Sequence, residues 1–375
     1  MKIWVIGRGY PTTSNKMWGS FEFEQAKLLA RNGHDVSYIS LTLSFFDRKD
    51  PRGYRNFIED NVNVHAYSHF YFPGKFGIYW EKFEDKCWAK ILGKAQEVSG
   101  LPDVIHVHYP SMISSIREIE KYRNKNVKIF VTEHWSRVLI NNLKKHEFDR
   151  LKYYGTHANC FASVSQLLMD AASDLTDISV PKVIIPNLIS PVFEPQKERK
   201  SKQDFVFIVV GRLVPIKQFD IVIKQFISAF SGKDNVRLKV IGAGEAKASL
   251  EKLAGDCPQI SFTGALKLKA VAREISEADA LVSYSKYETF CVPVTEAWAC
   301  GKPILISDKS GIAYCVNENL GKVVPFDEPE KLKAAMMDMY HNYDRYDADA
   351  ISKYAKDNFS AQAVYRILMD MYEKY

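Results

Sequence analysis

Apolar and polar residues alternate along the first half of the chain in blocks that predict strands separated by helices. Short runs rich in β-branched and aromatic residues are followed by amphipathic stretches, which is the pattern of βαβ units. The runs are almost continuously apolar, as expected where helices cover both faces of a parallel sheet. The strands predicted in this half are Lys2–Ile6, Asp35–Ser40, Val104–His108, Lys128–His134, Asn159–Val164 and Lys182–Pro186.

The same pattern starts again after a polar and charged stretch that follows Asn187. This stretch has the composition of an exposed connection, so it places a domain boundary near residue 200. Apolar residues recur at helical spacing from Phe219 to Phe230, and residues 328–375 are also helical in pattern. The strands predicted in this half are Phe205–Val210, Val236–Ile241, Ile260–Gly264, Ala280–Ser285, Pro303–Ser307 and Val323–Phe326.

These blocks predict an α/β protein with two Rossmann-like, doubly wound domains. A chain of 375 residues exceeds the size at which a single hydrophobic core usually stops growing. We assign residues 1–200 to the first domain, 201–355 to the second and 356–375 to a final helix.

Composition narrows the class of protein further. Hydrophobic residues make up 46% and charged residues 26% of the chain, which is typical of a globular protein. No apolar run approaches the roughly 20 residues that span a bilayer, and the first residues lack the features of a signal peptide, so we expect a cytoplasmic protein. The six cysteines show no CxxC pair or zinc spacing and are predicted to be reduced structural thiols.

The net charge of +6 lies entirely in the first half of the chain. This asymmetry suggests that the first half meets an anionic partner. The excess is too small to indicate nucleic acid, which we do not expect as a partner.

Candidate chemistry is concentrated in the segment YETFCVPVTEAWACGKP, residues 287–303. It follows a buried strand, and Pro293 suits the first position of a new helix, whose backbone N–H groups would face a bound phosphate or sugar oxygen. Glu288 is expected on the loop and Glu296 in the first helical turn, where a carboxylate complements the helix dipole. The spacing alone also fits two solvated glutamates.

A second candidate segment, GRLVPIK, lies at residues 211–217. It reads as a strand end followed by a turn and a helix start at Pro215, so Arg212 and Lys217 flank one crevice. Two cations at that place can neutralise a diphosphate leaving group as its charge grows. The alternative is that both cations form surface ion pairs.

Together these segments resemble glycosyltransferase family 4, the retaining glycosyl transferases group 1. Residues 287–303 are similar to the E-x7-E element of that family, and residues 211–217 are similar to its GRLxxxKG element. The resemblance implies that Glu288 binds donor-sugar hydroxyls, that Glu296 binds the nucleotide ribose, and that Arg212 and Lys217 bind the diphosphate. Cys291 stands where the family usually has glycine.

Several other positions differ from the family or join the implied site. Gln218 replaces the last glycine of GRLxxxKG, and Leu188 replaces the glycine of a PNG hinge element. The turn with a single G-x-G at residues 241–250 reads as a strand-to-helix connection. The expected donor-binding positions are Gly19, Gly211, Arg212, Lys217, Gly264, Leu266, Glu288, Thr289, Phe290, Cys291, Val292 and Glu296.

The resemblance implies the GT-B arrangement, two Rossmann-like domains that face each other across a cleft, with the final helix returning to the first domain. It implies a nucleotide-diphosphate sugar as donor, with UDP-sugar as the expectation, and a glycan or lipid-linked acceptor. Retention of anomeric configuration follows from the resemblance alone. Because Arg212 and Lys217 can replace the charge of a divalent cation, no metal and no cofactor are expected.

Histidines at strand ends supply the remaining candidates. His134 closes the apolar run IFVTEH and should lie at the carboxyl edge of the first sheet. The family has a histidine here beside the reacting sugar, so the resemblance implies a catalytic group together with Arg212, Lys217 and Glu288. His106 and His108 are predicted to be structural, because no carboxylate or cysteine accompanies them at a metal-binding spacing.

Competing functions are a nucleotide-sugar epimerase of the same fold, an NAD-dependent oxidoreductase and a non-catalytic sugar-binding protein. Neither half has a complete G-x-G-x-x-G followed by an acidic residue, which disfavours NAD binding. A dependence on an acceptor separates a transferase from an epimerase.

The segment Tyr67 to Lys90 interleaves aromatics with lysines, and a basic run from Arg117 to Lys128 follows it. This pattern suggests peripheral binding at the anionic inner face of a membrane. Aromatics packed in the core beside a solvated lysine face would give the same pattern.

Overall fold

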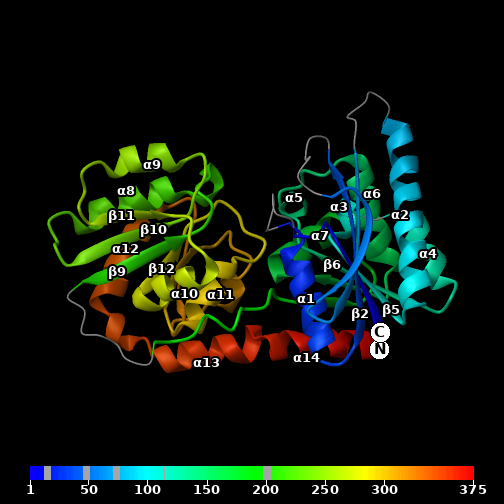
Figure 1. Cartoon of the computed structure of the whole chain (residues 1–375). Helices are drawn as coiled ribbons and strands as arrows, with labels where there is room; N and C mark the ends of the chain where they lie inside the picture. Colours follow the sequence, from blue (N-terminus) through cyan, green and yellow to red (C-terminus); the bar gives the residue numbers. More distant parts are fainter. Residues whose placement is uncertain (12–17, 45–50, 71–76, 114, 197–203) are drawn as a thin grey trace. The chain divides into compact units, whose positions relative to one another are not determined.

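A computed structural model describes residues 1–11, 18–44, 51–70, 77–113, 115–196 and 204–375 of the chain. Contacts divide these residues into two compact units (Figure 1). The first contains Met1–Val164, Leu168–Ile185 and Tyr365–Tyr375, and the second contains Ser165–Leu167 and Pro186–Val364. The chain thus leaves the first unit at Ile185, directly after its last strand and ahead of the charged stretch near residue 200. It returns at Tyr365, later than residue 356.

An eight-stranded sheet with the order β3-β4-β2-β1-β5-β6-β7-β8 forms the centre of the first unit. All neighbouring strands are parallel except β3 and β4. Both faces are covered, since Ile3 to Ile6 of the central strand are 0% exposed. The strands are β1 (Lys2–Gly7), β2 (Asp35–Ser44), β3 (Gly53–Glu59), β4 (Val62–Phe70), β5 (Val104–His108), β6 (Lys128–Glu133), β7 (Cys160–Ser163) and β8 (Lys182–Ile184).

Strands β3 and β4 form an antiparallel hairpin that the sequence analysis missed. Asp60 and Asn61 connect them, with φ of 49° and 64°. Two successive residues at positive φ are typical of the type I′ turn that fits the twist of a hairpin. The Asp-Asn pair between two β-rich runs was therefore a usable signal.

Helices pack on both sides of this sheet (Figure 1), with α1 on one side and α2 and α4 on the other. Apolar stripes such as Phe23, Ala26 and Leu29 of α1 are buried against the strands. The helices of this unit are α1 (Ser20–Arg31), α2 (Gly77–Ser99), α3 (Pro110–Ile113), α4 (Ile116–Arg123), α5 (Ser136–Leu139), α6 (Lys145–His157) and α7 (Gln166–Thr176).

A parallel six-stranded sheet with the order β11-β10-β9-β12-β13-β14 forms the second unit. The predicted helix from Phe219 to Phe230 is confirmed as α8, and its apolar stripe is buried. The strands are β9 (Phe205–Val210), β10 (Val236–Ile241), β11 (Ile260–Gly264), β12 (Ala280–Ser283), β13 (Ile304–Ser307) and β14 (Gly321–Val324).

The helices of the second unit connect these parallel strands or follow the last of them (Figure 1). They are the 3-10 turns η1 (Pro215–Lys217), η2 (Ala313–Cys315) and η3 (Tyr343–Arg345), and α8 (Phe219–Phe230), α9 (Lys247–Ala254), α10 (Leu268–Glu277), α11 (Val292–Ala299), α12 (Pro329–His341) and α13 (Ala348–Phe359). The prediction of an α/β protein with two doubly wound domains is confirmed.

The last helix, α14 (Ala361–Lys374), contributes most of its length to the first unit. Its Tyr372 is buried, and the Tyr372 hydroxyl lies 2.6 Å from Nδ1 of His106 on β5. Tyr365 lies 2.9 Å from Nε2 of His34 through its hydroxyl. These two contacts fix the helix along the first sheet.

Candidate functional site

The loops that carry most of the candidate residues leave the second sheet at its topological switch point. From β9 the strand order runs to β10 and β11 on one side and to β12, β13 and β14 on the other. The loop Gly211–Lys217 follows β9, and residues 284–288 follow the adjacent strand β12. Because connections diverge there, the carboxyl ends of these two strands form the crevice in which open α/β sheets bind ligands.

Lys217 and Glu288 meet at this edge through an ion pair between Nζ and Oε1. Both side chains are half-buried, and the Ser285 hydroxyl donates to the same carboxylate oxygen at 3.1 Å. Burial lowers the pKa of Lys217, but the charge of Glu288 and its hydrogen bond raise it by more, so the net shift is upward. The ammonium therefore stays charged, and it is neutralised by Glu288 as long as no anion competes.

Arg212 lies beside this pair and is exposed. Its charge opposes protonation of Lys217, which shows that the two cations are neighbours. Within the described part of the chain, Arg212 has no ion-pair partner. An exposed guanidinium next to a cation held in place is suited to binding a phosphate.

The G-x-G turn at residues 242–244 holds the Arg212 loop in place. The Leu213 amide donates to the Ala243 carbonyl at 2.9 Å, and the Ala246 amide donates to the Leu213 carbonyl at 2.9 Å. A Cβ on Gly244 would lie 2.3 Å from the Leu213 oxygen. Both glycines of this turn therefore allow close backbone approach, a role that the sequence analysis did not assign to them.

Two departures from the family pattern fall on backbone positions that favour glycine. Cys291, the N-cap of α11, has φ of 85°, and Gln218 has φ of 51°. Both lie in the left-handed region, which costs a residue with a Cβ about 1–2 kcal/mol. The Cys291 thiol is buried 3.3 Å from the Ser283 hydroxyl, and burial raises its pKa to about 12, so it stays protonated.

Glu296 lies beyond the first turn of α11, because that helix begins at Val292. The expected contribution from the helix dipole is therefore wrong. Its side chain is half-buried, and burial raises the pKa of its carboxyl to about 7. The carboxylate has no ion pair or hydrogen bond with another described residue, so its acceptors are open to a ligand.

The other expected donor-binding positions divide into two groups. Phe290 is 1% exposed and packs edge-on against Phe359, which makes it part of the core. Thr289 and Val292 are half-buried beside Glu288 and Cys291. Gly264 and Leu266 lie at the end of β11, next to the G-x-G turn, because the Gly242 amide donates to the Gly264 carbonyl at 3.0 Å.

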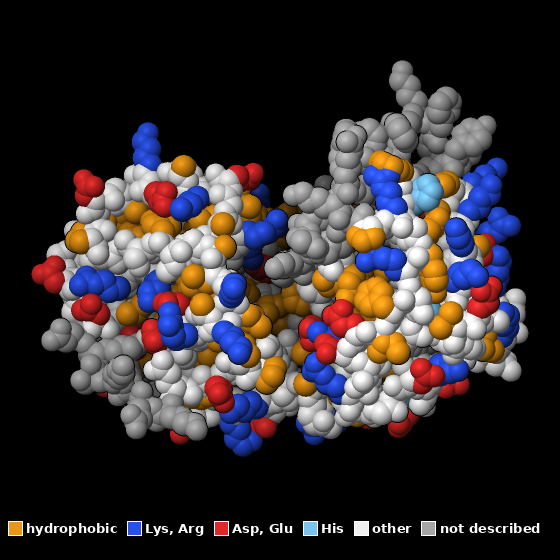
Figure 2. All heavy atoms as spheres, viewed as in Figure 1, with side chains coloured by type: hydrophobic (Ala, Val, Ile, Leu, Met, Phe, Trp, Pro, Cys, Tyr) orange, Lys and Arg blue, Asp and Glu red, His pale blue; other side chains and the backbone are white. Residues whose placement is uncertain are grey.

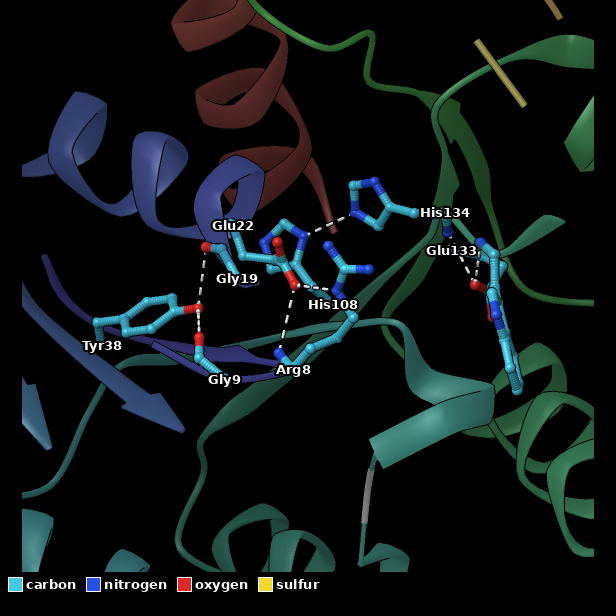
Figure 3. Close-up of polar contacts among 9 residues, drawn as sticks. Arg8, Gly9, Gly19, Glu22, Tyr38, His108, Glu133 and His134 are labelled. Carbon is cyan, nitrogen blue, oxygen red and sulfur yellow. Dashed lines mark hydrogen bonds and ion pairs between the residues drawn. The ribbon is translucent and has the colours of Figure 1, made fainter. Parts of the chain in front are cut away.

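The first unit has a matching site at its own switch point, between β1 and β5. Arg8 follows β1, and its guanidinium lies 3.9 Å from the ring centre of Tyr109, which follows β5. Arg8 Nε also donates to the fully buried Glu22 at 2.9 Å. The hydroxyl of Tyr38 binds the carbonyl oxygens of Gly9 and Gly19 at 2.7 and 3.2 Å. These contacts place the predicted residue Gly19 at this edge (Figure 3).

His134 lies at the same edge, directly after β6, as predicted. Its Nε2 is 2.9 Å from Nδ1 of His108, and its ring stacks on Tyr109 at a centroid distance of 4.7 Å. Burial lowers the pKa of His134 well below its usual value, and the charge of Arg8 lowers it further. The backbone is fixed by Glu133, whose carboxylate accepts the amides of His134 and Trp135 at 2.8 Å each (Figure 3).

The two histidines predicted to be structural are both buried, but they have different partners. His106 binds Tyr372 and the Thr132 hydroxyl on either side. His108 instead contacts the candidate residue His134. His106 and His108 are two positions apart on β5, so their side chains point to the same face of the sheet. Only the packing against the neighbouring strand β6 shows which of them reaches His134.

The described residues contain neither a cluster of metal-ligating side chains nor a helix that could cross a bilayer. No group of three or more His, Cys, Asp or Glu side chains there is arranged to hold a metal ion. Within the same residues, no helix has both the length and the apolar character needed to cross a bilayer.

The chain is similar to known glycosyltransferases in sequence. Residues 193–358 match the family model for glycosyl transferases group 1. The chain is 32% identical over 139 residues to a GDP-mannose-dependent alpha-mannosyltransferase of Mycobacterium tuberculosis, an alignment that spans 36% of this chain and 35% of the relative. It is 22% identical over 324 residues to an N-acetyl-alpha-D-glucosaminyl L-malate synthase of Bacillus anthracis, spanning 83% of this chain and 80% of the relative.

Among solved structures, the chain is similar to a sucrose-phosphate synthase from Thermosynechococcus elongatus, with a TM-score of 0.78, 17% identity and coverage of 100% of this chain and 98% of the other. At that identity the similarity shows the fold, which is GT-B. The chain spans about a third of the length of the mannosyltransferase relative. Arg212, Lys217 and Glu288 all lie inside residues 193–358, the segment that matches the family model for glycosyl transferases group 1.

Proposed function

We propose that this chain is a retaining glycosyltransferase of the family 4 type, which transfers a sugar from a nucleotide-diphosphate sugar to a glycan or lipid-linked acceptor. The observation that carries the proposal is the group of Arg212, Lys217 and Glu288 at the switch point of the second sheet. It lies within the segment that matches the family. A surface ion pair would not require a glycine turn to hold the neighbouring arginine loop.

The proposed chemistry follows from the charges at this edge. Breaking the bond between sugar and diphosphate builds negative charge on the leaving phosphate, and Arg212 and Lys217 stabilise that charge without a divalent metal. Glu288 releases Lys217 to the phosphate and accepts hydrogen bonds from the sugar hydroxyls. Glu296 accepts the ribose hydroxyls. The departing phosphate takes the proton of the acceptor on the same face, and His134 contacts the sugar.

The donor base is the least constrained part of the proposal. The sequence analysis expects UDP, whereas the mannosyltransferase relative is named for GDP-mannose. Calorimetric titration of the full chain with UDP, GDP, ADP and the matching monophosphates decides between them. Binding of one diphosphate well above its monophosphate supports the proposal, and equal binding of both would contradict it.

Variants at the two glutamates test their separate roles. Glu296→Ala should weaken binding of the free nucleoside diphosphate, whereas Glu288→Ala should spare it and damage transfer. Equal losses of free nucleotide affinity would reject this division. Sugar release that requires an acceptor, together with no interconversion of the donor in its absence, would exclude an epimerase, which the relatives do not favour.

We further propose that the first unit binds an anionic membrane surface beside its acceptor. Lys82, Lys86 and Lys90 recur every fourth residue on α2, so they share one face, and all three are exposed. Figure 2 shows Lys and Arg side chains along the part of the surface formed by α2 and α4. Lys75, which the sequence analysis included, lies outside the described residues.

Two findings narrow this membrane proposal. Tyr67 and Trp88 are 7% and 1% exposed, so these aromatics pack in the core and are not available to insert into lipid. Lys121 and Arg123 on α4 are paired with glutamates of their own helix. The proposal therefore rests on electrostatic attraction by the α2 stripe alone.

A further inference from the structure

His108 and His134 form a buried pair whose proton positions are linked. Nδ1 of His108 and Nε2 of His134 are 2.9 Å apart, and the two side chains are 0% and 6% exposed. A hydrogen bond between two neutral imidazoles needs one N–H and one bare nitrogen. Two arrangements satisfy it: His108 donates through Nδ1–H, or His134 donates through Nε2–H.

The outer nitrogen of His108 decides between them. Nε2 of His108 is buried and has no hydrogen-bond partner among the described residues. If His134 donated, neutral His108 would carry its proton on Nε2 as a buried donor without an acceptor. If His108 donates, Nε2 is a bare acceptor. A buried N–H without a partner is much rarer in proteins than an acceptor without one.

The charges around the pair keep both rings neutral. Burial lowers the pKa of both rings, and the positive charge of Arg8 at the end of β1 lowers it further. Glu22 on α1 is bound to Arg8, and Glu133 on β6 accepts backbone amides. Neither carboxylate therefore holds a proton on His108 Nε2.

We propose that His108 is a positioning residue that holds His134 as the neutral Nδ1–H tautomer, so that His134 offers a hydrogen-bond donor to an oxygen of the sugar ligand. Nδ1 of His134 has no bond within the described protein and is not one of its buried unpartnered atoms. Stacking on Tyr109 fixes the plane of the ring. Figure 3 shows the His134 ring meeting His108 with one nitrogen while the other is turned away.

This inference rests on the proposed function only for the identity of the ligand. His134 in this state cannot take a proton through Nδ1, because that nitrogen already carries one. It therefore binds and orients its ligand as a donor, and it is not a general base. His106 keeps the His108 ring in place. The two rings stack at a centroid distance of 4.4 Å, and His106 itself is hydrogen-bonded to Tyr372 and Thr132.

The tautomer can be measured without any substrate. In the full chain labelled with 15N-histidine, long-range proton–nitrogen correlation spectra report which ring nitrogen carries the proton. Comparison with His134→Asn and His108→Asn assigns the two rings among the nine histidines. We expect both rings to be neutral and protonated on Nδ1 from about pH 6 to about pH 8. A proton on Nε2 of His134, or a charged ring, would overturn the inference.

A pair of variants tests the positioning role. Asn can supply an N–H close to the position of Nδ1, whereas Phe keeps the ring but not the donor. His108→Asn should keep kcat/KM within about threefold of wild type, and His108→Phe should lower it by about tenfold and give His134 mixed tautomers. Unchanged transfer and an unchanged His134 tautomer in His108→Phe would refute positioning by His108.

A matched control uses another buried strand histidine. His65 on β4 is 0% exposed and binds Tyr54 and Ser99 away from the pair. His65→Phe should leave the tautomer of His134 unchanged. Because nucleotide titration tests the second unit and these spectra test the first, the inference and the proposed function can fail independently.

Discussion

Replacing Arg212 or Lys217 by methionine should lower the rate of transfer to a similar extent, but the two changes should affect stability differently. Met keeps most of the length of either side chain and removes the charge. Each variant removes a charge that stabilises the leaving phosphate, and the loss of one such group lowers kcat by about 100- to 1000-fold, or about 3 kcal/mol. The kcat for transfer should therefore fall by about two to three orders of magnitude in each of Arg212→Met and Lys217→Met.

The stability difference follows from their partners. Lys217 neutralises Glu288, and the two side chains are only 20% and 17% exposed. Without Lys217, the half-buried Glu288 carboxylate keeps the hydrogen bond from the Ser285 hydroxyl but loses its ion pair. This loss should lower the free energy of unfolding by about 1–3 kcal/mol. Arg212 is exposed and has no ion pair within the described chain, so Arg212→Met should change stability by less than about 0.5 kcal/mol.

Urea unfolding measures the stability difference, and calorimetry with nucleoside diphosphate and monophosphate measures the phosphate site. Both variants should lose diphosphate affinity and keep monophosphate affinity. Lys224→Met is a matched control, because Lys224 is 52% exposed and forms an ion pair with Asp220 of its own helix. A stable Lys217→Met variant, or near wild-type transfer by either variant, would show that the assigned geometry is wrong.

Three further results are expected. Burial raises the pKa of the Glu296 carboxyl from its usual value of 4.5 to about 7. Between these two pH values the folded chain binds more protons than the unfolded chain, so its stability falls as the pH rises. The free energy of unfolding of the wild type should therefore drop by about 1–3 kcal/mol across this range relative to Glu296→Gln. Urea unfolding at several pH values measures this, and parallel pH curves would contradict it. Cys291→Gly should be more stable than Cys291→Ala by about 1 kcal/mol in thermal unfolding, because glycine is unstrained at a φ of 85° and alanine is not. Alanine is usually the more stabilising of the two residues, so a more stable Cys291→Ala would show that this position is not strained. In vesicle sedimentation, binding to anionic lipid at low salt should decline with salt and weaken in Lys82→Glu/Lys86→Glu by about 1 kcal/mol or more per residue, and a chain that ignores anionic vesicles would exclude the membrane proposal.

The sequence was sufficient for the doubly wound architecture because hydrophobic periodicity is a local property. Buried parallel strands need continuous apolar runs, and covering helices need an apolar stripe, so both can be read from neighbours in the chain. The hairpin β3–β4 was missed because its edge strand is half exposed and carries a mixed pattern. Its Asp60-Asn61 turn was the stronger signal.

Motif order also indicated Arg212, Lys217 and Glu288, because the ends of adjacent parallel strands meet at one sheet edge. The sequence could not show that Lys217 and Glu288 bind each other, since their contact joins residues far apart in the chain. It could not show the position of Glu296 within α11 either, because the helix starts only after Cys291 adopts a left-handed conformation.

The first unit shows the same division most clearly. His106 and His108 are indistinguishable in sequence, as alternate residues of one buried strand. Packing against β6 and α14 separates them: His106 is enclosed by Thr132 and Tyr372, whereas His108 reaches His134. Local periodicity thus determined which residues are buried and which strand ends carry polar groups. Only the tertiary structure decided which of those groups touch, because hydrogen bonds act over about 3 Å and depend on how distant segments pack.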